Sequence, residues 1–201
     1  MRSVEGLLLQ LHMTPLVTAL MGLFVLSGAP QAAWTEAATI SKPEMVFPSY
    51  QVSVTGYNAV PGQTDDTPFE TSIGAYTNPE IIAARSSDLA EKLPYGTVIA
   101  FEPVENSSNC GFGVVEDSIG LRVIGDAMHP RMRNKIDILF SSHDYVSVGG
   151  KERNAARAFG FCKEVTIRVV GKIDIKNMPE TQAELLRMVN TQHSEVFAVN
   201  T

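Results

Sequence analysis

The sequence predicts a mainly β domain of the small-barrel type, and three observations lead to this expectation. About six or seven short segments have the composition of strands and are bounded by turns rich in Gly, Pro, Asn and Asp. Only short helical patterns separate these segments, whereas a parallel α/β sheet needs a longer helix after each strand. A single amphipathic helical pattern lies near the C-terminal end. This combination favours a closed barrel.

The first 33 residues predict a signal peptide or an N-terminal membrane anchor. Residues 16–33 carry no charge, and their apolar core, residues 16–26, has the length of a signal-peptide core rather than of a full membrane span. Small residues that suit a cleavage site follow this core. Residues 34–48 mix Ala, Thr, Pro and Ser and predict a linker. We therefore expect an exported protein of the periplasm or cell envelope, with its signal either cleaved or retained as an anchor.

Length, charge and cysteine content restrict the class of protein further. The chain has 201 residues and a net charge of −6, so the part after the linker is one domain with a sizeable core. The acidic balance argues against nucleic acid as a partner. Two cysteines, Cys110 and Cys162, are too few for a disulfide scaffold. In an oxidising compartment they would form one disulfide, and otherwise they would be two buried thiols.

In the first half of the domain, residues 50–57 alternate apolar and polar side chains and predict the first strand. Residues 58–72 are polar and rich in Pro and Gly, so we expect a long loop, and ordered loops of this length are often functional. An apolar run at 81–84 predicts a buried strand. Residues 86–93 predict one or two helical turns that begin at a serine cap, and residues 98–104 predict the next strand.

In the second half, residues 105–113 predict a surface loop, and we expect four further strands at 114–116, 121–125, 136–140 and 165–173. A break at Gly149-Gly150 and a short helix ending at Gly160 precede the last strand. Residues 178–190 predict an amphipathic helix whose apolar face carries Leu185, Leu186, Met188 and Val189. The domain therefore spans residues 49–173, and a C-terminal helix and tail span 174–201.

The most informative stretch is residues 124–140, in which each of two acids is flanked by apolar, strand-forming residues. Asp126 and Asp137 would lie at a strand end and in the next strand, with a loop containing Pro130 between them. This arrangement could bring both acids to one cleft, where their pKa values would separate and one acid could stay protonated. In the simpler interpretation, Asp126 caps a turn and Asp137 pairs with a nearby arginine.

A metal site is the other chemistry that these acids suggest. Asp126 and Asp137, together with His129 or His143, offer oxygen and nitrogen ligands for a divalent ion. However, the sequence has no H-E-x-x-H motif or comparable ligand spacing. We therefore expect no metal and no other cofactor.

Four segments resemble a known family. They are T-G-Y-N-A-V-P-G-Q-T-D-D-T-P-F-E-T-S at 55–72, L-P-Y-G-T-V at 93–98, D-A-M-H-P-R-M-R-N-K-I-D-I-L-F at 126–140 and A-x-x-F-G at 156–160. They look like the three-aspartate (3D) domain of membrane-bound lytic transglycosylase A and of stationary-phase and resuscitation-type cell-wall enzymes. The resemblance covers roughly residues 50–173. It implies a six-stranded double-psi β-barrel with short helices.

The resemblance also implies an activity and a substrate, the glycan strands of peptidoglycan. Such enzymes cut the bond between N-acetylmuramic acid and N-acetylglucosamine without water and leave a 1,6-anhydro end. One carboxylic acid first protonates the glycosidic oxygen and then, as a carboxylate, accepts the proton of the muramoyl C6 hydroxyl. Asp126 and Asp137 match the second and third aspartates of the motif. We expect Asp137 to be the general acid/base and Asp126 to raise its pKa or to orient the sugar.

The first aspartate of the family pattern has no clear match. Many members carry it in an A-V-D-P context shortly before the P-x-G-T turn, where this chain has a longer insert containing Ser86 and Asp88. The alternatives are Asp65 and Asp66 in the T-D-D-T-P-F segment, which we expect to complete the catalytic set. In the simpler interpretation, these two aspartates cap a turn.

We expect four residues to bind the substrate: Tyr57, Thr64, Arg131 and Asn134. Tyr57 could stack on a sugar, and Arg131 could line a groove for the acidic lactyl-peptide part of the wall, although such charges more often face solvent. For Phe69, packing in the core is the stronger expectation. A non-catalytic peptidoglycan-binding or scaffold module on the same barrel is the alternative function, and there the C-terminal helix would dock a protein partner.

Overall fold

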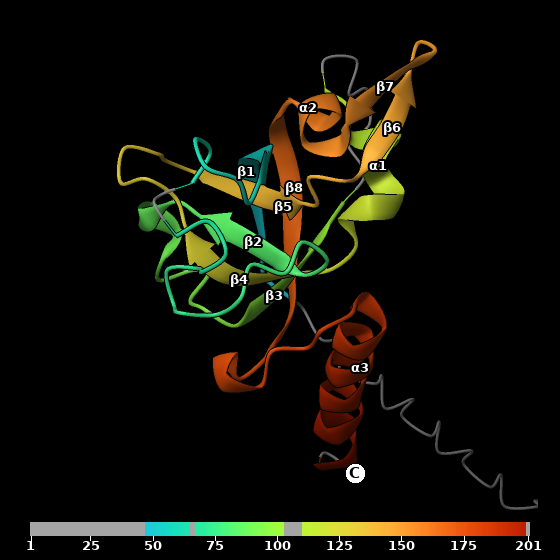
Figure 1. Cartoon of the computed structure of the whole chain (residues 1–201). Coiled ribbons are helices and arrows are strands. Elements are labelled where there is room, and N and C mark those ends of the chain that lie inside the picture. The colour runs from blue at the N-terminus through green and yellow to red at the C-terminus, as the bar shows by residue number, and fades with distance from the viewer. Residues whose placement is uncertain (1–46, 65–66, 103–109, 200–201) are drawn as a thin grey trace, which may run out of the picture. The chain divides into compact units, whose positions relative to one another are not determined.

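The structure, a computed structural model, describes residues 47–64, 67–102 and 110–199. The predicted signal peptide or anchor and most of the predicted linker lie outside these residues. Six strands form a closed barrel in the order β1-β5-β2-β4-β3-β8 (Figure 1). These strands are β1 (Ser49–Asn58), β2 (Ile82–Arg85), β3 (Thr97–Phe101), β4 (Arg122–Ala127), β5 (Lys135–Phe140) and β8 (Phe161–Lys172). The predicted mainly β, six-stranded barrel is confirmed.

The pairing around the barrel is mixed. Strand β1 runs parallel to β5 and β2 runs parallel to β4, whereas the other four neighbouring pairs are antiparallel. If β1 is exchanged with β4, β2 with β5 and β3 with β8, the barrel has the same neighbouring pairs, with the same parallel or antiparallel directions. Each strand of one half of the chain therefore has both of its neighbours in the other half.

Buried apolar side chains form two clusters on the two faces of the strands. Along β5, Ile136 and Ile138 belong to the first cluster, and Leu139 belongs to the second. The first cluster also includes residues of the helices α1 (Phe112–Ile119) and α2 (Ala155–Phe159), and the second includes residues of α3 (Gln182–Val199). Because successive side chains of a strand point to opposite faces, the apolar residues on one face pack in the first cluster and those on the other face pack in the second.

The strand predicted at 114–116 is wrong, because this segment belongs to helix α1. Its buried residues are Phe112, Val115 and Ile119, which are spaced as one face of a helix. The two adjacent valines suggested a strand, but the helix period over eight residues outweighs that local preference. The strand predicted at 121–125 corresponds to β4, and β3 ends at Phe101 rather than at residue 104.

Gly149 and Gly150 form the turn of a β-hairpin, whereas the sequence predicted only a break at this position. Strands β6 (Tyr145–Val148) and β7 (Lys151–Asn154) pair antiparallel around Gly149 and Gly150, which have φ angles of 59° and 76°. Helix α2 follows directly, and the Asn154 side chain caps it by accepting a hydrogen bond from the Ala156 N–H at 3.1 Å. Figure 1 shows the hairpin and α2 together at one end of the barrel.

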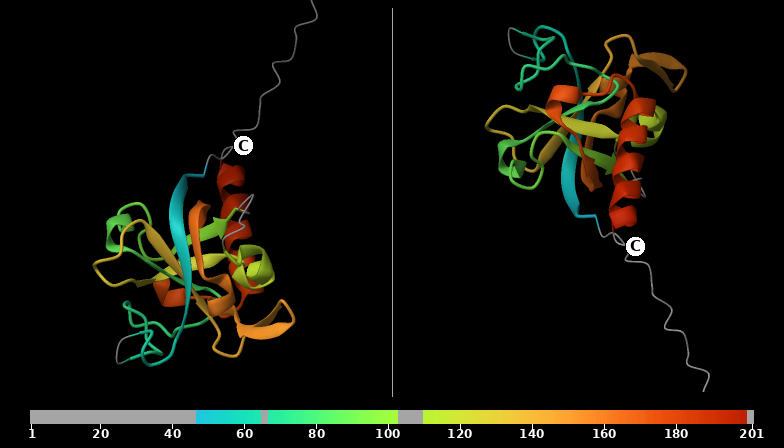
Figure 2. Two further views of the ribbon diagram at one scale, coloured as in Figure 1. Left: turned by 90° about the horizontal axis from the view of Figure 1, so that it is seen from above. Right: turned by 90° about the horizontal axis from the view of Figure 1, so that it is seen from below.

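The C-terminal helix α3 packs beside the barrel (Figure 2). It begins at Gln182, later than predicted, after a short 3-10 helix η2 (Ile175–Asn177). Leu185 and Val189 are buried against the second cluster, whereas Leu186 is half exposed, so only part of the predicted apolar face is covered. In the described part of the chain, no helix has the length and apolar character needed to span a membrane. A protein partner at α3 stays a prediction.

The disulfide between Cys110 and Cys162 is confirmed, with the two Cα atoms 5.2 Å apart. It joins the residue that lies two positions before α1 to the second residue of β8. Next to it, the Gly111 N–H donates to the Phe159 carbonyl at 2.9 Å. The disulfide and this hydrogen bond fix the start of α1 to the end of α2 and to the barrel.

Gly96, in the turn before β3, provides a stability test. Its φ is +85°, and a Cβ there would lie 2.3 Å from the Ile173 carbonyl oxygen. Gly149 also has a positive φ, but no atom lies within 4 Å of its Cβ position. We expect Gly96→Ala to lower the free energy of unfolding by about 2–3 kcal/mol and Gly149→Ala by about 1 kcal/mol. Urea unfolding of both variants tests this, and equal losses would show that the close contact has no cost.

Candidate functional site

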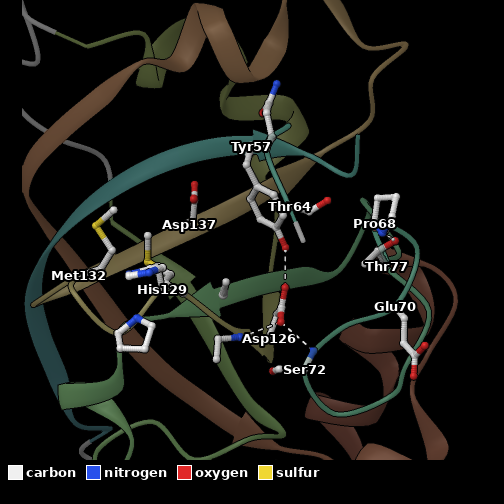
Figure 3. Close-up of a pocket in the computed structure, with 15 residues that line it drawn as sticks. Tyr57, Thr64, Pro68, Glu70, Ser72, Thr77, Asp126, His129, Met132 and Asp137 are labelled. Atoms are coloured by element: carbon white, nitrogen blue, oxygen red, sulfur yellow. Dashed lines mark hydrogen bonds between the residues drawn. The ribbon is translucent and has the colours of Figure 1, made fainter. Parts of the chain in front are cut away.

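A pocket of about 560 Å³ lies where β1, β5, β2 and β4 run side by side, and its volume is typical of small-ligand sites. The segments before β2 and between β4 and β5 form its sides. Figure 3 shows Tyr57 and Asp126 pointing toward each other across it. His129 and Met132 lie on one side, and Pro68, Thr77 and Glu70 lie on the other.

The floor of the pocket follows from strand register. Ala84 of β2 pairs with Asp137 of β5 on one side and with Asp126 of β4 on the other. The two acids are therefore two strand spacings apart, about 10 Å between Cα atoms. Because the side chain of Ala84 is a single methyl group, it leaves room between the carboxyl groups for a ligand.

A β-bulge brings the second acid to this face. Ala83 pairs with Ile124, but Ala84 pairs with Asp126, so Gly125 is the extra residue in β4. In a regular register, Asp126 would instead lie opposite Arg85, on the other face of the sheet. A Cβ on Gly125 would come within 2.7 Å of the end of the Ile82 side chain, so a larger residue here would require Ile82 to shift.

Asp126 is held by three donors. The Tyr57 hydroxyl donates to Oδ2 at 3.2 Å, and the N–H groups of Ser72 and Ala127 donate to Oδ1 at 2.9 and 2.8 Å. Three donors and no acceptor suit an ionised carboxylate. The Ser72 contact also ties the segment before β2 to β4.

Asp137 lies in a different environment. Burial, with a smaller contribution from the negative charge of Asp126, raises its pKa from 3.8 to about 6, while a hydrogen bond with the Thr55 side chain and the charge of Lys135 act in the opposite direction. Its Oδ1 atom is buried and has no hydrogen-bond partner among the described residues. A carboxyl group in this setting can hold a proton near neutral pH and deliver it to a ligand.

Tyr57 and Ser72 both donate to Asp126, and a stacked pair of side chains, Tyr95 and Arg85, lies next to Ser72. Burial, followed by the charges of Asp126 and Asp137, raises the pKa of the Tyr57 hydroxyl well above its ordinary value, so this hydroxyl stays a donor. The Ser72 hydroxyl lies 3.1 Å from the Tyr95 hydroxyl, and the Arg85 guanidinium stacks over the Tyr95 ring at 4.6 Å. This chain of contacts holds Ser72 in place beside Asp126.

The structure brings only two of the four predicted substrate-binding residues to the pocket. Tyr57 and Thr64 line it, whereas Arg131 and Asn134 do not. Arg131 is exposed on the loop between β4 and β5. Asn134 has a φ of 47° and donates from its side chain to the Gln51 carbonyl at 3.1 Å, so it shapes the loop that leads into β5.

The candidates for the first aspartate lie elsewhere or are not described. Asp65 and Asp66 fall outside the described residues. Ser86 and Asp88 lie at the 3-10 helix η1 (Ser87–Leu89) and do not line the pocket. There the Asp88 carboxylate accepts a hydrogen bond from the Asn134 N–H at 2.9 Å. The Ser86 hydroxyl accepts one from the Lys135 N–H at 3.0 Å, so both residues brace the start of β5.

Several pocket residues were not predicted from the sequence. Glu70 is a third carboxylate at the pocket, and Ser72 and Thr77 reach it from the same segment. Glu70 and Ser72 lie at the end of the predicted polar loop and in the family-like segment at 55–72, and Thr77 follows them, but the sequence assigned none of them a role. The expectation that Phe69 packs in the core is wrong, because it is 65% exposed beside Glu70. The segment before β2 folds back on itself through the Glu70–Tyr76 bridge and leaves this ring in solvent.

Among the residues that the structure describes, no three His, Cys, Asp or Glu side chains are grouped to hold a metal ion. His129 lines the pocket, but its Nδ1 atom accepts a hydrogen bond from the Arg131 N–H at 3.2 Å. The sequence matches no family model and no curated protein.

Proposed function

We propose that this protein cleaves the glycan strands of peptidoglycan in the manner of a lytic transglycosylase. One observation carries the proposal: the largely buried carboxyl group of Asp137, whose pKa is raised to about 6, lines a pocket with a second carboxylate, Asp126, that accepts three hydrogen bonds. Two acids whose environments differ in this way suit an acid/base role for one and an electrostatic role for the other. The resemblance of residues 126–140 to the three-aspartate motif supplies the substrate.

The proposed reaction needs a single proton carrier. Protonated Asp137 donates to the glycosidic oxygen as its bond to the muramoyl C1 breaks. The Asp137 carboxylate then accepts the proton of the C6 hydroxyl while that oxygen bonds to C1, which gives the 1,6-anhydro end and regenerates the acid. Water is not consumed, unlike in the two-carboxylate hydrolases. The negative charge of Asp126 would stabilise the positive charge that develops on the sugar ring.

We also propose that the protein acts outside the cytoplasm, in the cell envelope. The disulfide between Cys110 and Cys162 supports this placement, because such bonds persist in oxidising compartments. The uncharged apolar segment at residues 16–33 supports export as well. Peptidoglycan lies in the same compartment.

A peptidoglycan-binding module without catalysis is the second candidate. It is favoured by two exposed aromatic side chains in the segment beside the pocket, Phe69 at 65% and Tyr76 at 69% exposure. Aromatic rings that face solvent next to a polar pocket can stack on sugar rings. In this function, Asp126 and Asp137 would hydrogen-bond sugar hydroxyls without transferring a proton.

Digestion of purified sacculi by the full chain separates these functions. Mass spectrometry of the soluble products should find 1,6-anhydro ends. Products with reducing ends would replace the proposed reaction with hydrolysis. Retention of the protein on sacculi without any soluble product would overturn the enzyme proposal and leave the binding module.

Tyr57→Phe tests the role of the hydroxyl that donates to Asp126. The variant loses one hydrogen bond to a charged group, so we expect kcat/KM on sacculi to fall about tenfold, with little change in fold. Tyr50→Phe is a matched control on the same strand, because Tyr50 does not line the pocket and its ring faces Lys92. Equal kcat/KM values of the two variants would show that the Tyr57 hydroxyl has no role in the reaction.

A further inference from the structure

A second cavity, of about 630 Å³, lies between the end of β1, the β6–β7 hairpin and α2. Its lining is polar and includes Asn58, Gln63, Glu152, Arg153 and Arg157. The hairpin and the helix that form it stand together at one end of the barrel in Figure 1. The reaction proposed above uses none of these residues.

The charge of this cavity is opposite to that of the first pocket. Arg153 of β7 and Arg157 of α2 both line it, and among the lining residues that the structure describes Glu152 is the single carboxylate. Neither guanidinium makes a hydrogen bond or an ion pair with a described residue, and both side chains are exposed. These described side chains, two unpaired cations and one anion, carry a net charge of about +1, whereas Asp126, Asp137 and Glu70 make the first pocket acidic.

The two cavities meet at one side chain. Gln63 lines both of them, and its Oε1 atom accepts a hydrogen bond from the Asn58 N–H at 3.0 Å. Asn58 follows Tyr57, so consecutive residues of β1 face the two cavities. The Asn58 side chain is fixed in turn by donating to the Phe140 carbonyl at 3.0 Å. A ligand held at Asp137 could therefore continue past Gln63 into the basic cavity.

We infer that the basic cavity binds a carboxylate of the peptide attached to the glycan substrate. The inference rests on the proposed function, since it assigns a second part of the same substrate. Guanidinium groups bind carboxylates through paired, charge-assisted hydrogen bonds. A net charge near +1 matches a singly charged carboxylate better than a doubly charged phosphate. The role expected for Arg131 is thereby transferred to Arg153 and Arg157.

Binding to a protein that cannot turn over gives the test. The full chain with Asp137→Asn is titrated by calorimetry with a soluble disaccharide-peptide that carries free carboxylates. We expect the same chain with Arg153→Gln and Arg157→Gln to bind this ligand at least about tenfold more weakly. Arg187→Gln is the matched control, because Arg187 is exposed and lines neither cavity, and it should leave the affinity unchanged.

Two further ligands identify the group that is bound. A disaccharide-peptide with amidated carboxylates, and a peptide-free glycan chain, should each bind equally well with and without the two arginines. Unchanged affinity of the double variant for the acidic ligand would overturn the inference. Inorganic phosphate that displaces the acidic peptide at lower concentration than acetate does would also overturn the assignment to a carboxylate. Because both arginines are exposed, thermal unfolding should be unchanged and loss of fold can be excluded.

Binding of the acidic ligand and digestion of sacculi together distinguish failure of this inference from failure of the proposed function. Arginine-dependent binding of the acidic ligand, with no soluble product from sacculi, would support the inference and overturn the cleavage reaction. Cleavage with arginine-independent binding would support the reaction and overturn the inference.

Discussion

The variant Asp137→Asn is expected to lose cleavage of sacculi by a factor of about 10³ or more, because an amide cannot donate the proton that the leaving oxygen needs. The same proton requirement sets the pH dependence of the wild type. Since the pKa of Asp137 is raised to about 6, kcat/KM should fall as the pH rises above this value. Release of 1,6-anhydro products measured between pH 4 and pH 8 tests both expectations. Residual activity of the variant within tenfold of the wild type would contradict the role of Asp137.

The same substitution should stabilise the fold at neutral pH. The folded chain keeps the Asp137 proton up to about pH 6, whereas the unfolded chain loses it near pH 4. The free energy of unfolding therefore falls as the pH rises between these values, by about 3 kcal/mol in full, and stays lower above them. Asparagine carries no charge to bury. We expect Asp137→Asn to exceed the wild type in stability at pH 7.5 and to equal it at pH 3.5.

Asp88→Asn is the matched control, with the opposite sign. Although desolvation acts to raise it, the pKa of Asp88 is lowered by hydrogen bonds from the Ser86 side chain and the Asn134 N–H. The charged form of Asp88 therefore stabilises the fold above its pKa, and this stability is lost as the pH falls. Urea unfolding at both pH values should show a loss for Asp88→Asn at pH 7.5. A gain there would show that these hydrogen bonds do not matter.

Removing the disulfide is expected to have the largest effect on stability. The bond between Cys110 and Cys162 closes a loop with a sequence separation of 52. A disulfide that closes a loop of this length lowers the conformational entropy of the unfolded chain, which stabilises the fold by about 4 kcal/mol. We therefore expect the variant Cys110→Ala, Cys162→Ala to lose about this amount in urea unfolding. The barrel should still form, because the clusters on both faces of its strands stay in place.

Reduction of the wild type provides the comparison. Unfolding of the wild type in dithiothreitol should approach the curve of the double variant, whereas dithiothreitol should not move the variant itself. Equal stability of the wild type and the variant under oxidising conditions would mean that the bond adds nothing to folding.

Much of the barrel follows from local pattern. Residues 50–57 alternate so regularly that β1 was predicted within a residue at each end, and residues 136–140 gave β5 almost completely. Segment 114–116 failed because three residues cannot distinguish a strand from one turn of a helix. The helical spacing of the apolar residues is visible only when Phe112 and Ile119 are included.

The site was predictable only in part. Asp126 and Asp137 were expected near each other, but the strand between them, with Ala84 as their common partner, depends on pairing between distant segments. Gly125 inside a strand pattern was the one local sign of the bulge. Glu70 could not be assigned, because the path of the long segment before β2 depends on contacts such as that of Ser72 with Asp126.

The alternation of the two halves around the barrel has a consequence for how the chain reaches its fold. No two of β1, β2 and β3 are neighbours, so the first 101 residues contain no strand pair of the barrel, and every pair requires β4, β5 or β8. Folding must therefore wait for long-range contacts and proceed as one cooperative, comparatively slow event. The barrel can close only after β8 has been synthesised, because β1 and β3 each have β8 as a neighbour. Late closure of the barrel would suit the export proposed above, in which the chain crosses a membrane before it folds.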